Sequence, residues 1–228
     1  MFAAWEVGAW RVLREQVRFD LVVGASAGAW VGWEIACGAT PEELTREWLD
    51  PRTASVMRVG LHRSGWLRPE GMHAKAKELF AAGKPRIPFA LTVTEMPSMR
   101  VRIVRGEEVR WEHLAATCAI PLAYPPVRID GRLYVDGGLR GALPIWVAEE
   151  LGAERAIGLN CLTIAPFTLL RRILPPRKPS PKFDATVIEP SRGLGSLKDS
   201  VIWNVSNVGR WIEQGAEDAS RALSSVRM

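Results

Sequence analysis

The stretch FDLVVGASAGA, residues 19–29, decides the fold of this chain. It begins as a short, largely apolar run that ends in glycine, which predicts a buried strand. The apolar residues 29–37 that follow have the length and composition of a buried helix. Between the two, Gly24, Ser26 and Gly28 match the pattern G-x-S-x-G, which in this strand-turn-helix setting exposes a serine hydroxyl on a sharp turn.

The residues around Ser26 favour its use as a nucleophile. Gly24, Ala27 and Gly28 are small, so the backbone can turn tightly and the hydroxyl stays unobstructed. The N–H of Ala27 stands at the predicted helix start, where it can face a developing oxyanion. We therefore expect a serine nucleophile at Ser26, with these three residues shaping the turn and the oxyanion site.

The acid that could activate this serine lies far downstream, in Asp136-Gly137-Gly138. A Ser-His-acid hydrolase built on such a turn has the chain order serine, acid, histidine, yet all three histidines of this chain precede the motif. His113 could pair with an earlier acid such as Asp50, but it stands at the opening of a predicted helix. The sequence therefore favours a carboxylate that accepts the serine proton directly.

Four segments in this order resemble the patatin-like phospholipase family, and the resemblance covers most of the chain. Residues 19–29 look like the nucleophile segment, and ATCAIPLAYPP at 116–126 looks like the turn before the base. DGRLYVDGG at 130–138 is similar to the hairpin that delivers the aspartate. Residues 143–155 are similar to the helix and strand that follow it.

The resemblance implies an α/β, three-layer fold with a mainly parallel central sheet flanked by helices, as one domain over residues 1–228. Alternating strand and helix patterns favour the same class. The resemblance also implies a serine acyl hydrolase that acts on a phospholipid or other lipid ester through an acyl-enzyme, with Ser26 as nucleophile and Asp136 as base. Gly137 and Gly138 belong to the motif of the base. Neither a metal nor an organic cofactor is implied.

The aspartate poses a physical problem, because a free aspartate has a pKa of about 3.9 and is a weak base toward a hydroxyl. Direct contact with the serine and a pre-organised oxyanion site must therefore lower the barrier together. The family completes that site with a glycine-rich loop ahead of its first helix. This sequence contains no such loop, and residues 3–13 resemble the helix that follows it.

Two explanations of the missing loop stay open. In the first, which we favour, the domain is truncated at its N terminus because the start lies inside the true reading frame. In the second, the protein is impaired, since one lost oxyanion donor costs about 100- to 1,000-fold in rate. The alternatives to a lipid hydrolase are accordingly a small-ester or thioester hydrolase on the same dyad, or a catalytically impaired lipid-binding or regulatory protein.

Composition agrees with one enzyme domain. The chain has 228 residues, 47% of them hydrophobic, and can bury a sizeable core. Cys37, Cys118 and Cys161 are odd in number and lie in apolar contexts, which predicts buried free thiols and a reducing, cytoplasmic location. Neither a targeting segment nor an apolar run long enough to span a bilayer is recognisable.

The net charge of +5 suits an anionic partner. Basic residues gather within residues 171–182, either as a solvated loop or as a patch for peripheral contact with an anionic membrane surface. Nucleic-acid binding is disfavoured, because no aromatic and basic repeat accompanies the charge. The sequence does not determine the oligomeric state.

Local patterns predict further elements. Thr40, Pro41 and Glu43 predict a capped helix start, and Asp130-Gly131 predicts a tight hairpin. The remaining predictions are a loop flanking the site at 50–68, a helix from 68 to 83, a strand at 87–94, a hairpin of 100–104 with 108–111 around Gly106, a helix opening at 111–116, a buried strand at 156–162 and an amphipathic helix at 197–226.

Overall fold

Strand β4 (Phe89–Met96) is the centre of the fold, because three other strands pair with it in the computed structural model, which describes residues 1–62, 65–163, 175 and 177–226. β5 (Arg100–Arg105) runs antiparallel along one edge of β4. β1 (Val22–Gly24) and β7 (Arg132–Asp136) share the other edge, β1 parallel to β4 and β7 antiparallel. β6 (Val127–Ile129) then pairs with β7.

The register brings the ends of β1 and β7 together. Gly24, the last residue of β1, lies opposite Leu91, and Asp136, the last residue of β7, lies opposite Val93. The two strands run toward one another along the same edge, so only Thr92 separates their partners on β4. Residues that follow β1 and residues that end β7 therefore meet at one point of the sheet.

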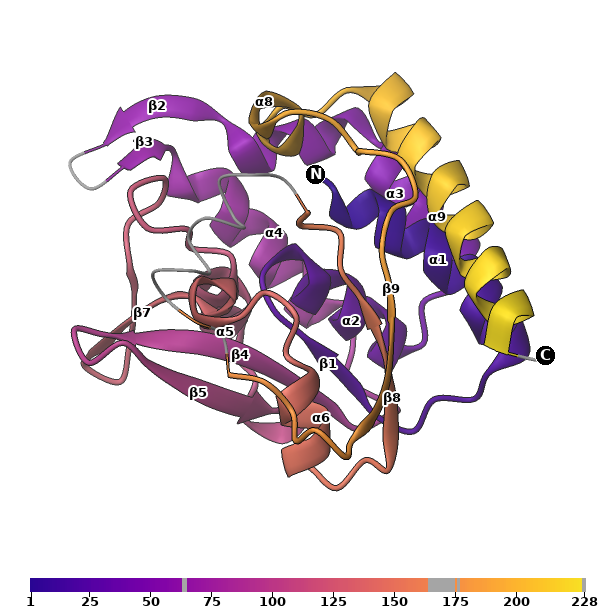
Figure 1. Ribbon diagram of the computed structural model, residues 1–228. Coiled ribbons are helices and arrows are strands. Elements are labelled where there is room, and N and C mark those ends of the chain that lie inside the picture. The colour runs from indigo at the N-terminus through magenta and orange to yellow at the C-terminus, as the bar shows by residue number, and fades with distance from the viewer. Residues whose placement is uncertain (63–64, 164–174, 176, 227–228) are drawn as a thin grey trace.

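Helices cover both faces of this sheet (Figure 1). α2 (Ala27–Cys37), α4 (Pro69–Ala81) and α5 (Trp111–Thr117) pack on the face to which Leu91 and Val93 point. α6 (Ile145–Glu150) packs on the opposite face, against Ala90 and Val101. The sheet is thus the middle of three layers, as expected when a central strand is buried on both of its faces.

A further core lies beside α2. α9 (Val205–Val226) lies along α1 (Ala3–Gln16) in Figure 1, and α3 (Pro41–Leu49) packs against both. The indole N–H of Trp5 donates to Asp218 at 2.8 Å within this contact. Among the described helices, none is both long enough and apolar enough to cross a membrane.

The expected α/β class is confirmed, and the central sheet is mixed. Parallel pairing joins β1 to β4, and also β8 (Arg155–Leu159) to β9 (Asp184–Ile188) in a separate two-stranded sheet. The pairs that β7 and β5 make with β4 are antiparallel, as is the β6–β7 hairpin. The hairpin turns at Asp130 and Gly131, both with positive φ, as the Asp-Gly pair predicted.

Several local predictions are confirmed. α2 ends at Gly38, whose φ of 98° is the left-handed conformation that glycine adopts readily. α3 begins with the predicted capping box, in which Glu43 N–H donates to Thr40 Oγ1 and Thr40 N–H donates to the Glu43 carboxylate. α4 and α5 also lie where the sequence predicted helices.

Other local predictions were wrong in part. Residues 50–68 hold η1 (Pro51–Met57), a 3₁₀ helix, and strands β2 (Val59–His62) and β3 (Gly65–Leu67) rather than a plain loop. Asp50 caps η1 by accepting the Arg52 N–H at 2.8 Å. After β5 the chain forms η2 (Gly106–Glu108) and then α5, so the second hairpin arm does not exist.

Two C-terminal predictions also need correction. The predicted strand at 156–162 is β8, which is half-buried and lies outside the central sheet because its partner is β9. The predicted helix at 197–226 is two helices, α8 (Leu197–Val201) and α9. They are separate because the backbone at Ile202 is extended, with φ −89° and ψ 118°.

Candidate active site

Ser26 occupies a strained turn between β1 and α2. Its φ of 54° and ψ of −138° lie in a region that costs a non-glycine residue about 1–3 kcal/mol. Gly24 makes the turn possible, since a Cβ there would lie 2.5 Å from the Ala29 Cα. This is the geometry of the strand-turn-helix that the G-x-S-x-G pattern predicted, and it leaves Ser26 half-buried.

The structure brings Ser26 and Asp136 into direct contact. Ser26 Oγ donates to Asp136 Oδ2 at 2.7 Å, and Gly138 N–H donates to Asp136 Oδ1 at 2.6 Å. The backbone of Asp136 is also fixed, because its N–H donates to Ala119 O and its carbonyl accepts from Thr94 Oγ1, both at 3.0 Å. The carboxylate is therefore held in one orientation.

Burial changes the acidity of Asp136. The residue is 5% exposed, and burial raises its pKa to about 7, although the hydrogen bonds from Ser26 and Gly138 act in the opposite direction. A carboxylate with a pKa near 7 is a far stronger base than a free aspartate. The raised pKa narrows the gap in acidity between the carboxyl group and a serine hydroxyl, and most of that gap remains.

Gly137 places the base against the sheet. It begins η3 (Gly137–Arg140), and a Cβ on it would lie 2.1 Å from the Thr92 carbonyl oxygen. A side chain would push η3 away from β4 and move Asp136 with it. The two glycines of the motif thus have different tasks, since Gly137 allows close packing and Gly138 orients the carboxylate through its N–H.

Thr117 is a site residue that the sequence did not reveal. Its Oγ1 accepts the Ser26 N–H at 2.9 Å and donates to the Thr92 carbonyl at 2.9 Å. The side chain is fully buried, so it joins the end of α5 to the strained turn and to β4. A threonine at the end of an apolar helix carries no sequence signal for this role.

Two groups lie at the start of α2. Ala27 is the first residue of the helix, so its N–H has no acceptor within the helix and stands at the positive end of the helix dipole. Glu6 of α1 lies beside Gly28, with Oε2 3.0 Å from the position of a Cβ there. Burial raises the pKa of Glu6 to about 7, and the Cys161 thiol donates to its Oε1 at 3.1 Å.

The sequence-predicted residues thus gather at one place, with Ser26 and Asp136 at the centre and the motif glycines around them. The family model for patatin-like phospholipases matches residues 1–149, which include both residues. The chain belongs to the patatin-like phospholipase family. Members of this family are lipid acyl hydrolases, which is the function class that the resemblance implied.

A solved structure supports the same fold for this patatin-like protein. VipD from Legionella pneumophila matches with a TM-score of 0.55 at 11% sequence identity. The match covers 98% of this chain and 65% of VipD, so the patatin-like chain spans just under two thirds of that protein. At this identity the similarity establishes the fold alone.

Two other candidate residues of this patatin-like protein, Cys118 and His113, are chemically unreactive. The Cys118 thiol lies against Ser26 and Asp136, and burial, followed by the Asp136 charge, raises its pKa well above the usual value. It therefore stays protonated at neutral pH. His113 is buried, its Nδ1 accepts the Arg110 N–H at 3.1 Å, and burial lowers its pKa to about 4. It holds the start of α5 as a neutral ring.

No candidate metal site is found in the part of the chain that the structure describes. No three His, Cys, Asp or Glu side chains lie together there in a way that could hold an ion. The three cysteines are free thiols, with Cys161 buried and the other two half-buried.

Proposed function

We propose that this protein is a serine lipid acyl hydrolase in which Ser26 and Asp136 form a catalytic dyad. The observation that carries the proposal is the 2.7 Å hydrogen bond from Ser26 Oγ to Asp136 Oδ2. Asp136 accepts the hydroxyl proton as Oγ attacks the ester carbonyl carbon, and then gives that proton to the departing alcohol. Asp136 next takes a proton from the water that attacks the acyl-enzyme, and returns it to Ser26 Oγ as the bond from Oγ to the acyl carbon breaks and the fatty acid leaves.

The negative charge on the carbonyl oxygen needs donors during both attacks. Ala27 N–H, at the positive end of α2, is the donor that the geometry favours. Gly138 N–H is engaged by Asp136, so it acts on the base rather than on the oxyanion. Thr117 supports the reaction indirectly, because it fixes the Ser26 backbone from which the Ala27 amide projects.

We also propose peripheral contact with an anionic membrane, through an exposed apolar rim made of Val59, Trp66 and Leu122. Their exposed fractions are 70%, 43% and 84%. Leu67 N–H donates to the Ala123 carbonyl at 2.9 Å, which brings the chain neighbours Trp66 and Leu122 into one region. Apolar side chains of this kind enter the interfacial zone of a bilayer.

The rim lies close to the proposed dyad and next to positive charge. The segment that carries Leu122 also supplies Ala119, whose carbonyl accepts the Asp136 N–H. Arg58 and Arg68 flank the rim, both exposed and joined by a backbone hydrogen bond at 2.9 Å. Of the basic cluster in residues 171–182, Arg171 and Arg172 lie outside the described residues, whereas Arg177, Lys178 and Lys182 are exposed and remain a second candidate for membrane contact.

The remaining expectations become part of the proposal. We place the protein in the cytoplasm on the strength of its free cysteines, with residues 1–228 acting as one patatin-like domain. The substrate is a phospholipid or another lipid ester, and no nucleic acid, metal or organic cofactor takes part.

The test is hydrolysis of a substrate panel by the purified protein, with Ser26→Ala as the blank. Phospholipid vesicles, long-chain and short-chain p-nitrophenyl esters and an acyl thioester make up the panel. Turnover that rises with acyl length and with vesicle surface supports a lipid hydrolase. Turnover of only short esters or of the thioester supports the small-substrate alternative, and vesicle binding without turnover supports an impaired lipid-binding protein.

A further inference from the structure

Leu122 combines two unfavourable features, an exposed apolar side chain and a left-handed backbone. Its exposed fraction of 84% is the largest of any large apolar residue in the described part of the chain. Its φ of 69° lies in the region that a residue with a Cβ adopts only at a cost in energy. Neither feature stabilises the protein in solution, because the side chain is in water and the backbone is strained.

The left-handed backbone of Leu122 belongs to a tight turn. Residues 120–123 form a β-turn, in which the Ala123 N–H donates to the Ile120 carbonyl at 3.1 Å. Proline, here Pro121, is favoured at the second position of such a turn, and glycine or asparagine at a third position with positive φ. Leucine therefore occupies the position where the turn favours glycine.

Neighbouring residues fix this turn. The Leu67 N–H of β3 donates to the Ala123 carbonyl at 2.9 Å. Tyr124 is 1% exposed, and its hydroxyl donates to the Val56 carbonyl at 2.6 Å. These contacts hold the turn from both sides of the chain, so Leu122 is kept in its left-handed conformation.

The same segment of chain contacts both members of the proposed dyad. Thr117 Oγ1 accepts the Ser26 N–H at 2.9 Å, and the Ala119 carbonyl accepts the Asp136 N–H at 3.0 Å. Leu122 follows Ala119 by three residues, which span at most about 11 Å of chain. A surface that takes up the Leu122 side chain therefore comes close to the residues that would cleave the ester.

We propose that Leu122 is a specificity-determining residue that enters the interfacial zone of an anionic bilayer and makes the dyad prefer esters in a membrane to esters in solution. The proposal rests on the hydrolase function and the rim proposed above. Transfer of a leucine side chain out of water is favourable, and this gain offsets the cost of the turn only when a bilayer is present. Arg58 and Arg68, both exposed beside the rim, supply charge that attracts anionic lipid.

The kinetic test compares phospholipid turnover in mixed phosphatidylglycerol and phosphatidylcholine vesicles with turnover of a short-chain ester dissolved as monomers. Leu122→Gly is expected to lower the ratio of vesicle turnover to monomer turnover about 10-fold, the loss expected when one leucine no longer leaves water. Leu122→Met keeps an apolar side chain and should keep the ratio of the parent protein. An unchanged ratio in Leu122→Gly would overturn the proposal.

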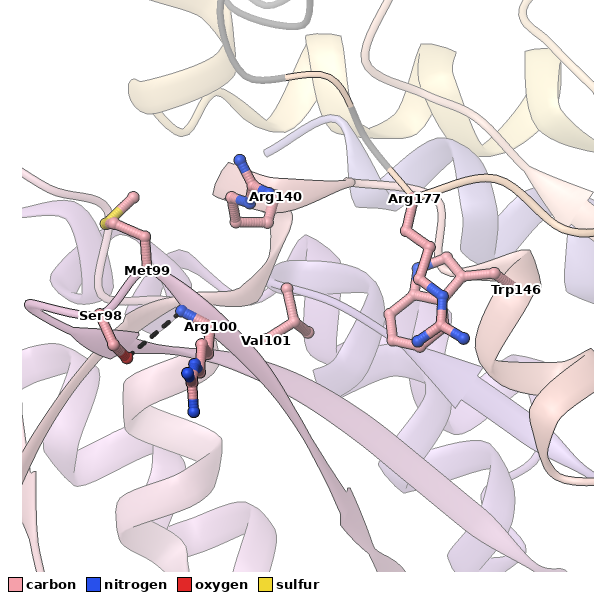
Figure 2. Close-up of a pocket in the computed structure, with 7 residues that line it drawn as sticks. All are labelled: Ser98, Met99, Arg100, Val101, Arg140, Trp146 and Arg177. Carbon is pink, nitrogen blue, oxygen red and sulfur yellow. Dashed lines mark hydrogen bonds between the residues drawn. The ribbon is translucent and has the colours of Figure 1, made fainter.

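Met99 provides the matched control. It is the other large apolar residue with positive φ in the described part of the chain, at 55° in the turn between β4 and β5. Figure 2 shows Met99 beside Ser98 and Arg100, at a pocket of about 470 Å³ to which no rim residue contributes. Met99→Gly should relieve strain as Leu122→Gly does and leave the turnover ratio unchanged. An equal fall of the ratio in both variants would show that relaxed turns lower it, and would overturn the proposal.

Urea unfolding tests whether the turn holds leucine against its preference. Leu122→Gly should unfold at a higher urea concentration than the parent protein, because glycine adopts a positive φ without steric cost and little of the leucine side chain is packed. A gain in stability together with a lower vesicle preference would show that the leucine serves the membrane contact. A lower urea midpoint for Leu122→Gly would overturn the argument from strain.

A binding test separates the membrane contact from the hydrolase function. In Ser26→Ala protein, the added Leu122→Gly change should weaken sedimentation with the same vesicles about 10-fold, whereas Met99→Gly should not. If the parent protein turns over no ester, the hydrolase function fails, yet Leu122-dependent vesicle binding would still support the membrane contact. Equal vesicle binding with leucine and with glycine at position 122 would overturn that contact, even in a protein that cleaves esters.

Discussion

Ser26 Oγ and Asp136 Oδ2 are 2.7 Å apart although 110 residues of sequence separate them. The contact exists because β1 and β7 end at adjacent points on one edge of β4. Asp136 is 5% exposed and has a pKa raised to about 7, so a buried base faces a half-buried hydroxyl.

Removing either partner should abolish ester hydrolysis and leave the fold intact. Ser26→Ala removes the nucleophile, and Asp136→Asn keeps the shape of the base but not its basicity. A fluorophosphonate probe should label Ser26 in the parent protein and no other serine. Near-normal turnover in Asp136→Asn would contradict the dyad, as would loss of activity in His113→Asn at unchanged stability.

The pH dependence of activity should follow the base. Because Asp136 has a pKa of about 7, kcat/KM should fall tenfold per pH unit below about pH 7, where the carboxylate is protonated. Glu6 also has a pKa of about 7, so Glu6→Gln serves as the control and should leave the midpoint in place. A midpoint near pH 4, the ordinary value of an aspartate, would show that the pKa of Asp136 is not raised in the active protein.

Stability should depend on pH through the same carboxyl group. Its pKa is about 7 in the folded protein and 3.8 without the fold, the value expected for the unfolded chain. Between these two pH values the folded protein therefore holds a proton on Asp136 that the unfolded chain has lost. The free energy of unfolding must then fall as pH rises from about 4 to about 7, by on the order of 4 kcal/mol from this group. Asp136→Asn should remove this fall in the free energy of unfolding.

Urea unfolding at pH 5 and pH 8 measures this effect as a difference between Asp136→Asn and the parent protein. The variant should gain stability over the parent at pH 8 and gain much less at pH 5. An equal difference at both pH values would mean that the folded and unfolded states share the same Asp136 pKa.

Thr117→Val should damage the site without changing side-chain shape. The variant leaves the Ser26 N–H and the Thr92 carbonyl without their shared partner, which costs about 1–3 kcal/mol of stability for each buried group left unpaired. Turnover should fall because the strained turn loses its support. Thr117→Ser restores the hydroxyl and should recover most of both losses, as read by urea unfolding and ester turnover.

Strain at Ser26 should be measurable by comparing two inactive variants. Glycine adopts φ 54°, ψ −138° more easily than alanine, so Ser26→Gly should be more stable than Ser26→Ala by about 1 kcal/mol despite the flexibility that glycine adds to the unfolded chain. Urea unfolding of both proteins decides the question. A lower unfolding midpoint for Ser26→Gly would show that the turn stores no appreciable strain.

Local signals predicted much of the fold. Ser26 and the small residues beside it specify their turn directly, and Asp130-Gly131 specifies its hairpin, because each depends on backbone conformations that few residues adopt. The segment after Gly106 was mistaken for a strand because its side chains alternate. There His113 accepts the Arg110 N–H and starts a helix instead.

The sequence patterns did not predict contacts between residues that lie far apart in the sequence. The roles of Thr117 and Glu6 depend on contacts with distant elements, and neither residue type is unusual in its helix. The same holds for β8, whose apolar run is compatible with either sheet and which pairs with β9 alone. Pairing partners of this kind are chosen by tertiary packing rather than by local propensity.

The end-to-end meeting of β1 and β7 makes the site sensitive to strand register. A slip of one residue moves a strand about 3.3 Å along the β4 edge and turns its side chains to the opposite face. Ser26 and Asp136 would then separate while both strands were still hydrogen-bonded. Covalent labelling of Ser26 therefore reports the alignment of the sheet itself, and its loss marks a misaligned protein that spectroscopic measures of strand content would still count as folded.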